Sequence, residues 1–449
     1  MRNGVVALAL ALFVLAPLRP ASAQFSLDAR RIGMGGVTLS RDGNARRFNP
    51  AYRAVKSRSN TGSPKFSIPL PIGLIPFFKD HPIGQLSTDP MFNPDSAAFN
   101  PFALANIILN PPIFYEVRKA PTPTNDVEFT IGRNQLKLDL GASEVLIPEQ
   151  EFGLGSTSRL LDPGFGVAGF RVSVMGFLEY DVGFTLDSAL RRALTDSVLP
   201  NDTLALLTDA VVQTGFAPTL AYAGRLTHGS GGAESDDGLY LGGAVHYYLG
   251  AMLGRGTGPT QLLIGDTIFA TSPTLQVNGL LRTSNKPFGK GVGGDVGIVW
   301  ISGPFEVGLG VNDIGAELTW SDTKVQQIFY DVAGDSVSST VVQNHVETKT
   351  KLPITYMANA ALRMGTGTTV GADVINSGRG TVIHVGAEQR TGPFALRGGV
   401  SRDQRKKMQF GLGGGLRFGS IGLDVGFWTH SNSFATKRGI TMATSISIY

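Results

Sequence analysis

Short runs in which apolar residues alternate with small or polar ones dominate the chain from about residue 127 to its end. In residues 305–312 (FEVGLGVN) and 421–427 (IGLDVGF), every second residue is apolar and the residues between them are glycine or polar. The side chains of a β-strand point alternately to opposite faces, so this pattern predicts strands with one apolar face. Glycine-rich turns between the runs predict antiparallel neighbours.

The composition of the second face decides what kind of sheet this is. A soluble antiparallel sheet hides its apolar face in a core and shows Lys, Glu and Thr to water. Here the second face is mainly glycine with isolated charges, and aromatic residues gather near the predicted strand ends, including Trp300, Phe305, Phe394, Phe418 and Trp428. An apolar outer face, a small and polar inner face and aromatic girdles are typical of a transmembrane β-barrel. The pattern therefore predicts an all-β transmembrane antiparallel barrel, with a soluble β-protein as the less favoured alternative.

The lengths of the connections indicate an orientation. The linkers at 302–304, 391–392 and 419–420 are tight, whereas those at 401–407 and 429–437 are longer and polar. Short turns are periplasmic and long loops external in such barrels. With the last strand ending in the periplasm, this order stays consistent back to about residue 165. It gives about sixteen candidate strands, of which two also fit loop hairpins.

Two inserts interrupt the alternation. Residues 188–213 have a helical pattern, in which Leu204, Leu207 and Val211 share one face. We expect an external loop helix there, with these three side chains either at a ligand entrance or packed on the barrel rim. Residues 322–351 predict an extended loop, formed by strands that continue beyond the membrane.

The N-terminal region divides into three parts before the barrel wall (127–449) begins. Arg2, an apolar run over residues 5–16 and the Ala-Ser-Ala site that ends at Ala23 predict a secretory signal peptide, 1–23, cleaved after Ala23. No later stretch reaches 18 uncharged apolar residues, which excludes helical membrane spans. Residues 61–125 hold 12 of the 25 prolines. Because proline lacks the backbone N–H of a strand ladder, 61–126 is predicted to be a plug or loop region with at most a first strand.

Composition and charge narrow the function classes. Glycine accounts for 58 of 449 residues and charged residues for 16%, which is far from the composition of an ordinary soluble enzyme. The chain has 39 cations and 35 anions, and removal of Arg2 and Arg19 with the signal leaves 37 against 35. This near balance gives no reason to expect a nucleic-acid partner. The absence of cysteine excludes disulfides, thiolate metal sites and cysteine nucleophiles.

The sequence offers no motif for catalysis or for a cofactor. The six histidines are scattered without the spacing of a metal site. The glycine strings at 291–294 and 411–415 lie inside predicted strands and not between a strand and a helix, so they are interpreted as wall glycines and not as nucleotide loops. No G-x-S-x-G elbow is present. We therefore expect neither an enzyme nor a bound cofactor or metal.

Isolated charged residues fall on the inner face of the predicted strands. Both signs occur among them, whereas an ion-selective pore would favour one sign. We expect them to pair with each other or with a plug, or to be solvated in the lumen. These predicted lumen residues are Asp295, Glu306, Asp373, His384, Glu388, Arg397, Arg417 and Asp424.

The start of the mature chain carries the most specific motif. Residues 31–37 (RIGMGGV) and 40–44 (SRDGN) precede Asn49-Pro50-Ala51. This order resembles the opening of the FadL-like superfamily of outer-membrane barrels, which includes long-chain fatty-acid transporters and PorV-type barrels of the type IX secretion system. Residues 291–297 (GVGGDVG), 308–315 (GLGVNDIG) and much of the chain from about residue 290 onward are similar to the same superfamily.

The resemblance implies a barrel of about fourteen strands, with 12 to 16 possible, and an N-terminal hatch segment (24–60) folded into its lumen. The glycines of the motif allow tight packing inside the barrel, and Asn49-Pro50 is a turn dipeptide. By the same resemblance, Tyr449 is the terminal aromatic residue that such barrels present to the assembly machinery, although it is one residue out of phase with the apolar set of the last strand. The predicted hatch motif consists of Gly33, Met34, Gly35, Gly36, Asp42, Asn49, Pro50 and Ala51.

Two functions fit these expectations. The first is transport or binding of a hydrophobic, fatty-acid-like small molecule across the outer membrane of a Gram-negative-type bacterium. The second is a PorV-like scaffold for secreted or surface proteins that does not transport. In both cases the expected partners are outer-membrane lipid and lipopolysaccharide, the barrel assembly machinery, and either a hydrophobic small molecule or a secreted protein.

Overall fold

The protein is seen here in a computed structural model, which describes only part of the chain. The described residues are 28–38, 45–55, 64, 66–85, 89, 114–118, 128–131, 136–139, 152–159, 162–188, 203–229, 235–263, 274–331, 336–365, 367–377, 380–402, 408–429 and 440–449. The expected signal peptide and Asp42 of the hatch motif lie outside them.

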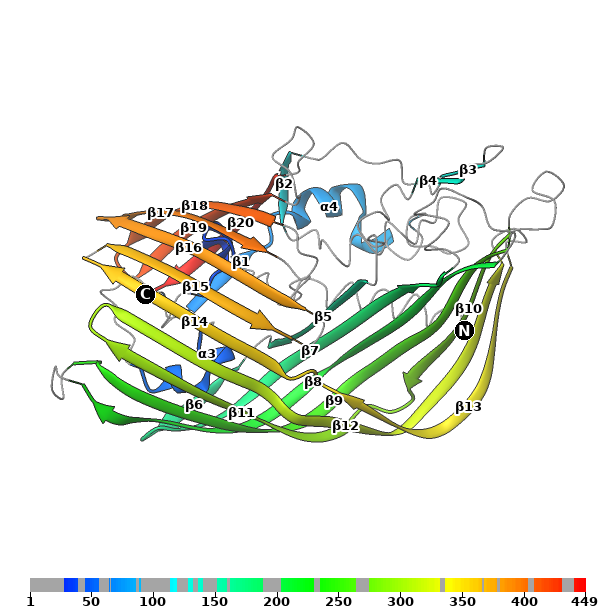
Figure 1. Cartoon of the computed structure of the whole chain (residues 1–449), viewed down its shortest axis with the longest axis horizontal. Coiled ribbons are helices and arrows are strands. Elements are labelled where there is room, and N and C mark those ends of the chain that lie inside the picture. The colour runs from blue at the N-terminus through cyan, green and yellow to red at the C-terminus, as the bar shows by residue number, and fades with distance from the viewer. Residues whose placement is uncertain are drawn as a thin grey trace.

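One large antiparallel sheet dominates the structure (Figure 1). Its strands are β1 (Phe66–Leu70), β2 (Tyr115–Arg118), β5 (Phe152–Arg159), β6 (Gly164–Val167), β7 (Phe170–Leu186), β8 (Thr203–His228), β9 (Gly238–Leu263), β10 (Thr274–Ser284), β11 (Gly289–Ser302), β12 (Phe305–Asp331), β13 (Ser336–Lys351), β14 (Thr355–Met364), β15 (Thr368–Asn376), β16 (Thr381–Thr391), β17 (Phe394–Arg402), β18 (Met408–Phe418), β19 (Ile421–Thr429) and β20 (Ile440–Ile448). A separate hairpin consists of β3 (Glu128–Ile131) and β4 (Leu136–Asp139).

The sheet has eighteen described strands but fewer positions around its circumference. Four strand pairs lie end to end along a shared neighbour: β1 and β2 along β20, β5 and β6 along β7, β10 and β11 along β9, and β13 and β14 along β12. Eighteen strands less these four continuations leave fourteen positions. This agrees with the prediction of about fourteen strands, and the sheet curls so that β14 to β20 face β6 to β12 across a lumen (Figure 1).

The outer face of the sheet carries an apolar band. On β12, the outward residues Phe305, Leu309 and Ile314 are 53%, 53% and 40% exposed, while Glu306 between them is buried. Beyond Ile314 the outward positions become polar, beginning with Glu317. Ten residues of a tilted strand match an apolar band about 25 Å tall. The predicted fold class, a transmembrane antiparallel β-barrel, is confirmed.

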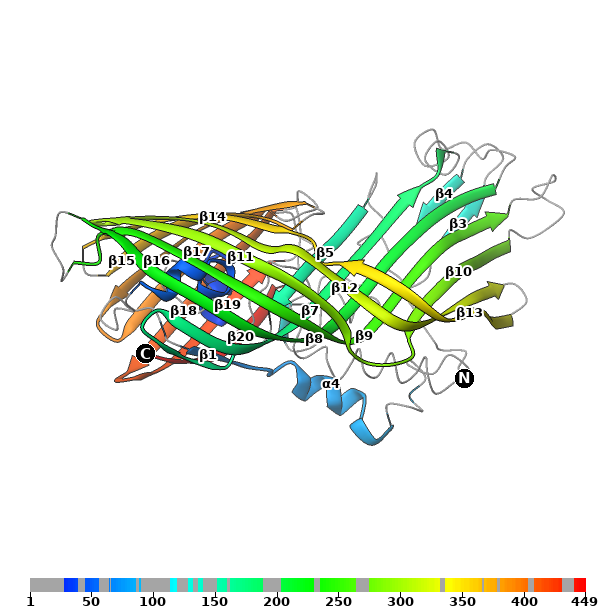
Figure 2. The same cartoon turned by 90° about the horizontal axis from the view of Figure 1, so that it is seen from below.

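The two sides of the wall differ in length. Strands β14 to β20 have 9 to 11 residues, which is about what a bilayer needs. In contrast, β8, β9 and β12 have 26, 26 and 27 residues and extend far beyond the apolar band. Figure 2 shows this half of the wall spreading outward at the end opposite to the short turns. Residues 322–331 and 336–351 form the upper parts of β12 and β13 in this extension.

The helices of the structure are short. Inside the lumen, α2 (Ala29–Gly33) contacts β17 to β20, and η2 (Pro50–Arg53), with α3 (Ala45–Phe48) just before it, contacts β8, β9 and β11 (Figure 2). Between β1 and β2, α4 (Leu74–Asp80) and η4 (Ile83–Gln85) leave the wall. Within the described ranges, no helix is long and apolar enough to cross a membrane.

The predicted loop helix at 188–213 is wrong for residues 203–213, and residues 189–202 lie outside the described residues. Residues 203–213 belong to strand β8, which pairs with β7 on one side and β9 on the other. The spacing of Leu204, Leu207 and Val211 fits a helix. Pairing on both edges satisfies its backbone groups, and this tertiary context outweighs the helical spacing.

Candidate binding site in the lumen

The hatch segment lies directly against glycines of the wall. A Cβ atom on Gly399 would overlap the carbonyl oxygen of Met34, and one on Gly426 would overlap the carbonyl oxygen of Ala29. At the other end of the segment, a Cβ on Gly242 would overlap the backbone of Ala51. Even alanine does not fit at these positions unless the hatch moves. The glycine-rich inner face is thus explained by a lumen that another stretch of backbone fills.

The hatch motif forms the turn after α2. Gly33 ends the helix against Gly413, and Met34 is fully buried. Gly35 and Gly36 have φ angles of +70° and +91°, which side chains with a Cβ rarely adopt. The motif therefore reverses the chain next to β17 and β18.

Asn49, Pro50 and Ala51 begin η2 and attach it to the opposite wall. The Asn49 side chain accepts the Ala51 N–H at 3.0 Å and donates through Nδ2 to the carbonyls of Ile298 and Leu309, at 3.1 and 3.0 Å. Pro50 occupies the first turn, where a missing N–H leaves no bond unmade. This neutral anchor joins the hatch to β11 and β12.

An ionic anchor holds α2 on the other wall. The Arg30 guanidinium donates to both oxygens of Glu388, at 2.9 and 3.1 Å, and Arg397 donates to Glu388 at 2.6 Å. Arg397 also pairs with Asp424 at 2.7 Å. All four side chains are at most 2% exposed, so each charge depends on the others for compensation.

The remaining predicted lumen residues also lie in contacts between wall and hatch or within the wall. His384 binds Asp373, which accepts the backbone N–H of Thr38 in the hatch. Glu306 pairs with Arg363 at 3.4 Å. The guanidinium of Arg417 lies 4.2 Å from the centroid of the Tyr449 ring. The predicted residues are thus distributed over several separate contacts.

A further buried polar cluster lies in the lumen, farther from the short turns than the hatch contacts. Arg159 donates to Asp295 at 2.8 Å and to Asp313 at 3.0 Å, and His246 Nε2 lies 2.8 Å from Asp295. Thr219 Oγ1 lies 2.7 Å from His246 Nδ1. Of these residues only Asp295 was predicted. On β9, Leu241 and Val245 face outward, so the alternation of the strand places His246 toward the lumen, a signal that the sequence already contained.

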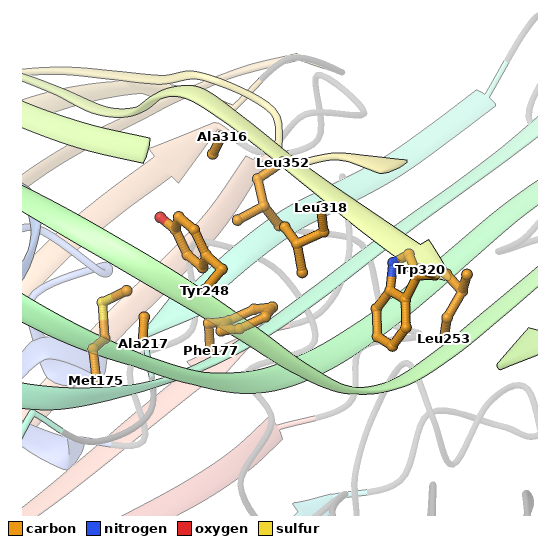
Figure 3. Close-up of a cluster of buried hydrophobic side chains, with 9 residues drawn as sticks. All are labelled: Met175, Phe177, Ala217, Tyr248, Leu253, Ala316, Leu318, Trp320 and Leu352. Carbon is orange, nitrogen blue, oxygen red and sulfur yellow. The ribbon is translucent and has the colours of Figure 1, made fainter. Parts of the chain in front are cut away.

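An apolar cluster of nine residues lies next to this polar cluster (Figure 3). Tyr248 links the two, because its ring packs edge-on against Phe177 at 5.2 Å while its hydroxyl donates to Asp313 at 2.6 Å. The Trp320 ring fills space that the glycines at 250 and 289 leave open, and its Nε1 donates to Thr350 at 3.0 Å. The members of the cluster are Met175, Phe177, Ala217, Tyr248, Leu253, Ala316, Leu318, Trp320 and Leu352.

The predicted entrance residues differ in whether they contact this apolar cluster. Val211 packs against it, whereas Leu207 is 47% exposed. The side chain of Leu204 lies outside the described parts of the structure. The structure therefore brings one of the three next to the apolar cluster.

Tyr449 lies on the inner side of the wall. Its side chain is 7% exposed and contacts Gly422, and Arg390 lies 5.3 Å from its ring centroid. Its backbone N–H donates to Ser420 at 2.9 Å. In the folded chain this terminal ring is therefore covered by protein.

The described lumen residues form ion pairs, hydrogen bonds and apolar contacts. In the part of the chain that the structure describes, no group of three His, Asp or Glu side chains is placed to hold a metal ion. Along the inner face of β9, the order from the short turns outward is a hatch contact at Gly242, the buried polar cluster that includes His246, and the apolar cluster at Tyr248 and Leu253. The described lumen thus holds an apolar cluster beyond the hatch segment.

A curled antiparallel sheet with an apolar outer band and a lumen filled by the N-terminal segment defines a plugged transmembrane β-barrel. No protein family and no curated relative matches the chain by sequence. Among solved structures, the chain is similar to the toluene transporter TbuX of Ralstonia pickettii (13% identity, TM-score 0.29, 69% of this chain and 94% of that one). It is also similar to a FadL homologue of Pseudomonas aeruginosa (11%, 0.33, 62% and 77%) and to the toluene transporter TodX of Pseudomonas putida (11%, 0.30, 73% and 95%).

Proposed function

We propose that this protein is an outer-membrane channel that passes a small hydrophobic molecule. The observation that carries the proposal is the buried cluster of nine apolar residues in the lumen, directly above the plug. The protein would reach the outer membrane of a Gram-negative-type bacterium through the signal peptide that ends at Ala23. Outer-membrane lipid, lipopolysaccharide and the barrel assembly machinery would be its partners there.

Weak binding of the ligand would suit passage better than storage. Burial of about 150 Å² of apolar ligand surface contributes about 4 kcal/mol, at about 25 cal/mol per Å². A free energy of that size corresponds to a dissociation constant of about 1 mM. Binding of this strength is selective for apolar molecules and still allows rapid release.

The plug supports a selective channel over an open pore. The hatch segment is attached to opposite walls of the lumen, through Arg30 to Glu388 on one side and through Asn49 to the carbonyls of Ile298 and Leu309 on the other. A water-filled path of the kind that porins use would require the loss of these contacts. A ligand that can displace apolar contacts has an advantage over water and ions.

The charges next to the apolar cluster favour an uncharged ligand. Arg159 already pairs with two carboxylates, Asp295 and Asp313. A carboxylate head group placed here would add a third negative charge to a dry site with one guanidinium, which is unfavourable. The proposed ligand is therefore a neutral hydrophobic molecule, or an amphiphile whose charged head stays in water.

The test measures binding through Trp320 in the purified, folded barrel. The chain has three tryptophans, so Trp300→Phe with Trp428→Phe leaves Trp320 as the only reporter. We expect 1-octanol to change its fluorescence saturably and octanoate, of equal chain length, to bind at least about tenfold more weakly. The detergent must lack an acyl chain.

A matched pair of variants checks that the cluster is the site. Leu318 is fully buried in the cluster, and Thr319 is the next residue on the opposite face of β12. Leu318→Asn should weaken octanol binding by about tenfold or more, and Thr319→Asn should leave it within about twofold. Equal effects of the two changes, or tighter binding of octanoate than of octanol, would refute the proposal. Nothing in the described residues favours the scaffold alternative.

A further inference from the structure

The first and last strands of the wall are joined by a weak pair. β1 has five residues, one of which is Pro69, and proline donates no ladder hydrogen bond. β2 has four residues, and its register with β20 shifts between Glu116 and Arg118. In contrast, β19 pairs with β20 over nine residues without a shift. Together β1 and β2 pair with eight residues of β20, so this closing pair, β1 and β2 against β20, is made of two short pieces where β19 provides one continuous strand.

The Asp28 side chain supplies a bond to both sides of the closing pair. Its Oδ1 accepts from Ser67 Oγ of β1 at 3.1 Å and from Ser445 Oγ of β20 at 3.4 Å. The same atom accepts the Arg30 N–H at 3.0 Å and so caps α2. In return, the Ala29 N–H donates to Ser445 Oγ at 3.3 Å. One carboxylate thus connects the hatch helix, the first strand and the last strand.

The apolar side of α2 reaches the second half of the closing pair. Ala29 and Ile32 form a buried cluster with Trp428 of β19 and Ala443 of β20. Phe114, directly before β2, packs against this cluster, with its ring edge-on to Trp428 at 4.7 Å. Both short strands of the first wall position therefore have contacts that depend on α2.

We propose that Asp28 and helix α2 form a clamp that holds β1 and β2 against β20. The N-terminal segment then has two separate roles, because it holds the first wall position against the last strand as well as filling the lumen. The neutral anchor at Asn49 lies on β11 and β12, far around the wall from the closing pair. Loss of that anchor should loosen the plug and leave the clamp intact.

The test uses engineered disulfides as reporters of strand pairing. Because the chain has no cysteine, the two introduced cysteines have no other cysteine of the chain to pair with. Ile68 and Ile446 are direct partners across the closing pair, and Leu423 and Ile446 are direct partners across β19 and β20. Ile68→Cys with Ile446→Cys reports the closing pair. Leu423→Cys with Ile446→Cys is the matched control. None of these three residues belongs to the clamp.

Asp28→Ala should lower the oxidation yield of the closing-pair reporter at least about threefold and leave the control pair unchanged. Asp28→Asn keeps the Oδ1 acceptor and should stay near the wild-type yield. Asn49→Ala should also leave the closing-pair yield unchanged. A wild-type closing-pair yield in Asp28→Ala would overturn the proposal, as would an equal loss in Asn49→Ala.

A second variant, which removes only the bond between Asp28 and β1, covers the case in which Asp28→Ala does not fold. Folding is checked by the slower gel migration of the barrel after boiling. Ser67→Ala deletes the bond to β1 and keeps the cap of α2. If the closing-pair yield falls in this variant while the β19–β20 yield holds, the clamp is supported. If both yields match the wild type, it is not.

Discussion

The hatch segment is held at its two ends by different kinds of interaction. At α2, four buried charges of Arg30, Glu388, Arg397 and Asp424 form one connected group. At η2, the amide of Asn49 bonds to two wall carbonyls. Removal of one charge from the first anchor leaves others uncompensated, whereas removal of the amide from the second leaves only neutral groups unpaired. The ionic end should therefore be the more sensitive to change.

Glu388→Gln should have the largest effect. Arg30 and Arg397 would each lose a buried ionic partner, which costs about 3–5 kcal/mol. Urea unfolding in lipid vesicles, followed by tryptophan fluorescence, measures this loss. Gln389→Ala on the adjacent, exposed position is the control, and a loss below about 1 kcal/mol in Glu388→Gln would show that the anchors do not differ as described.

Gly399→Ala tests the close contact between the turn after α2 and strand β17, at the same end of the hatch segment. Its Cβ would overlap the Met34 carbonyl, so α2 must shift, with an expected loss of about 2–3 kcal/mol. Gly398→Ala is a close control, since a Cβ there meets open space. Limited proteolysis should cut the N-terminal segment faster in Gly399→Ala only. Equal cleavage of both variants would contradict tight contact between hatch and wall.

Asn49→Ala should weaken the neutral anchor by about 1–2 kcal/mol, because two bonds to wall carbonyls and the cap of η2 are lost. Asn49→Asp keeps the capping oxygen and loses the donor. If the bonds to Ile298 and Leu309 matter, Asn49→Asp is no more stable than Asn49→Ala in the same unfolding experiment. Recovery of stability in Asn49→Asp would assign the whole effect to the cap.

Tyr52→Phe should have the smallest effect. It removes the hydroxyl that accepts from Asn359 Nδ2 at 2.6 Å, and the expected loss is about 0.5–1 kcal/mol. The ring and its buried contacts stay in place. A loss as large as that of Glu388→Gln would contradict the ranking of the two anchors.

The sequence was sufficient where a residue's environment follows from local alternation. Strict period-2 runs such as 305–312 predicted the strands and their inward faces, and the glycines of β17 to β19 predicted close approach by another backbone. The phase of Tyr449 was also visible in the last strand. These features depend on one strand at a time.

The sequence was insufficient where the outcome depends on a partner far along the chain. Residues 203–213 were predicted to be helical because spacing alone could not reveal that β7 and β9 flank them. Arg159 and Asp295 are 136 positions apart, and only the strand registers bring them together. The division of the first wall position into β1 and β2, with α4 between them, is likewise a result of pairing with β20.

The long half of the wall changes where a solute first meets the protein. Residues 315–331 of β12 lie beyond the apolar band and, at about 3.3 Å per residue, span at most about 55 Å. A hydrophobic solute dissolves poorly in the hydrated sugar coat that covers an outer membrane. Under the proposed function, a rim that projects into this coat would shorten the path of the solute through it, so the rate of capture would depend on strand length as much as on affinity.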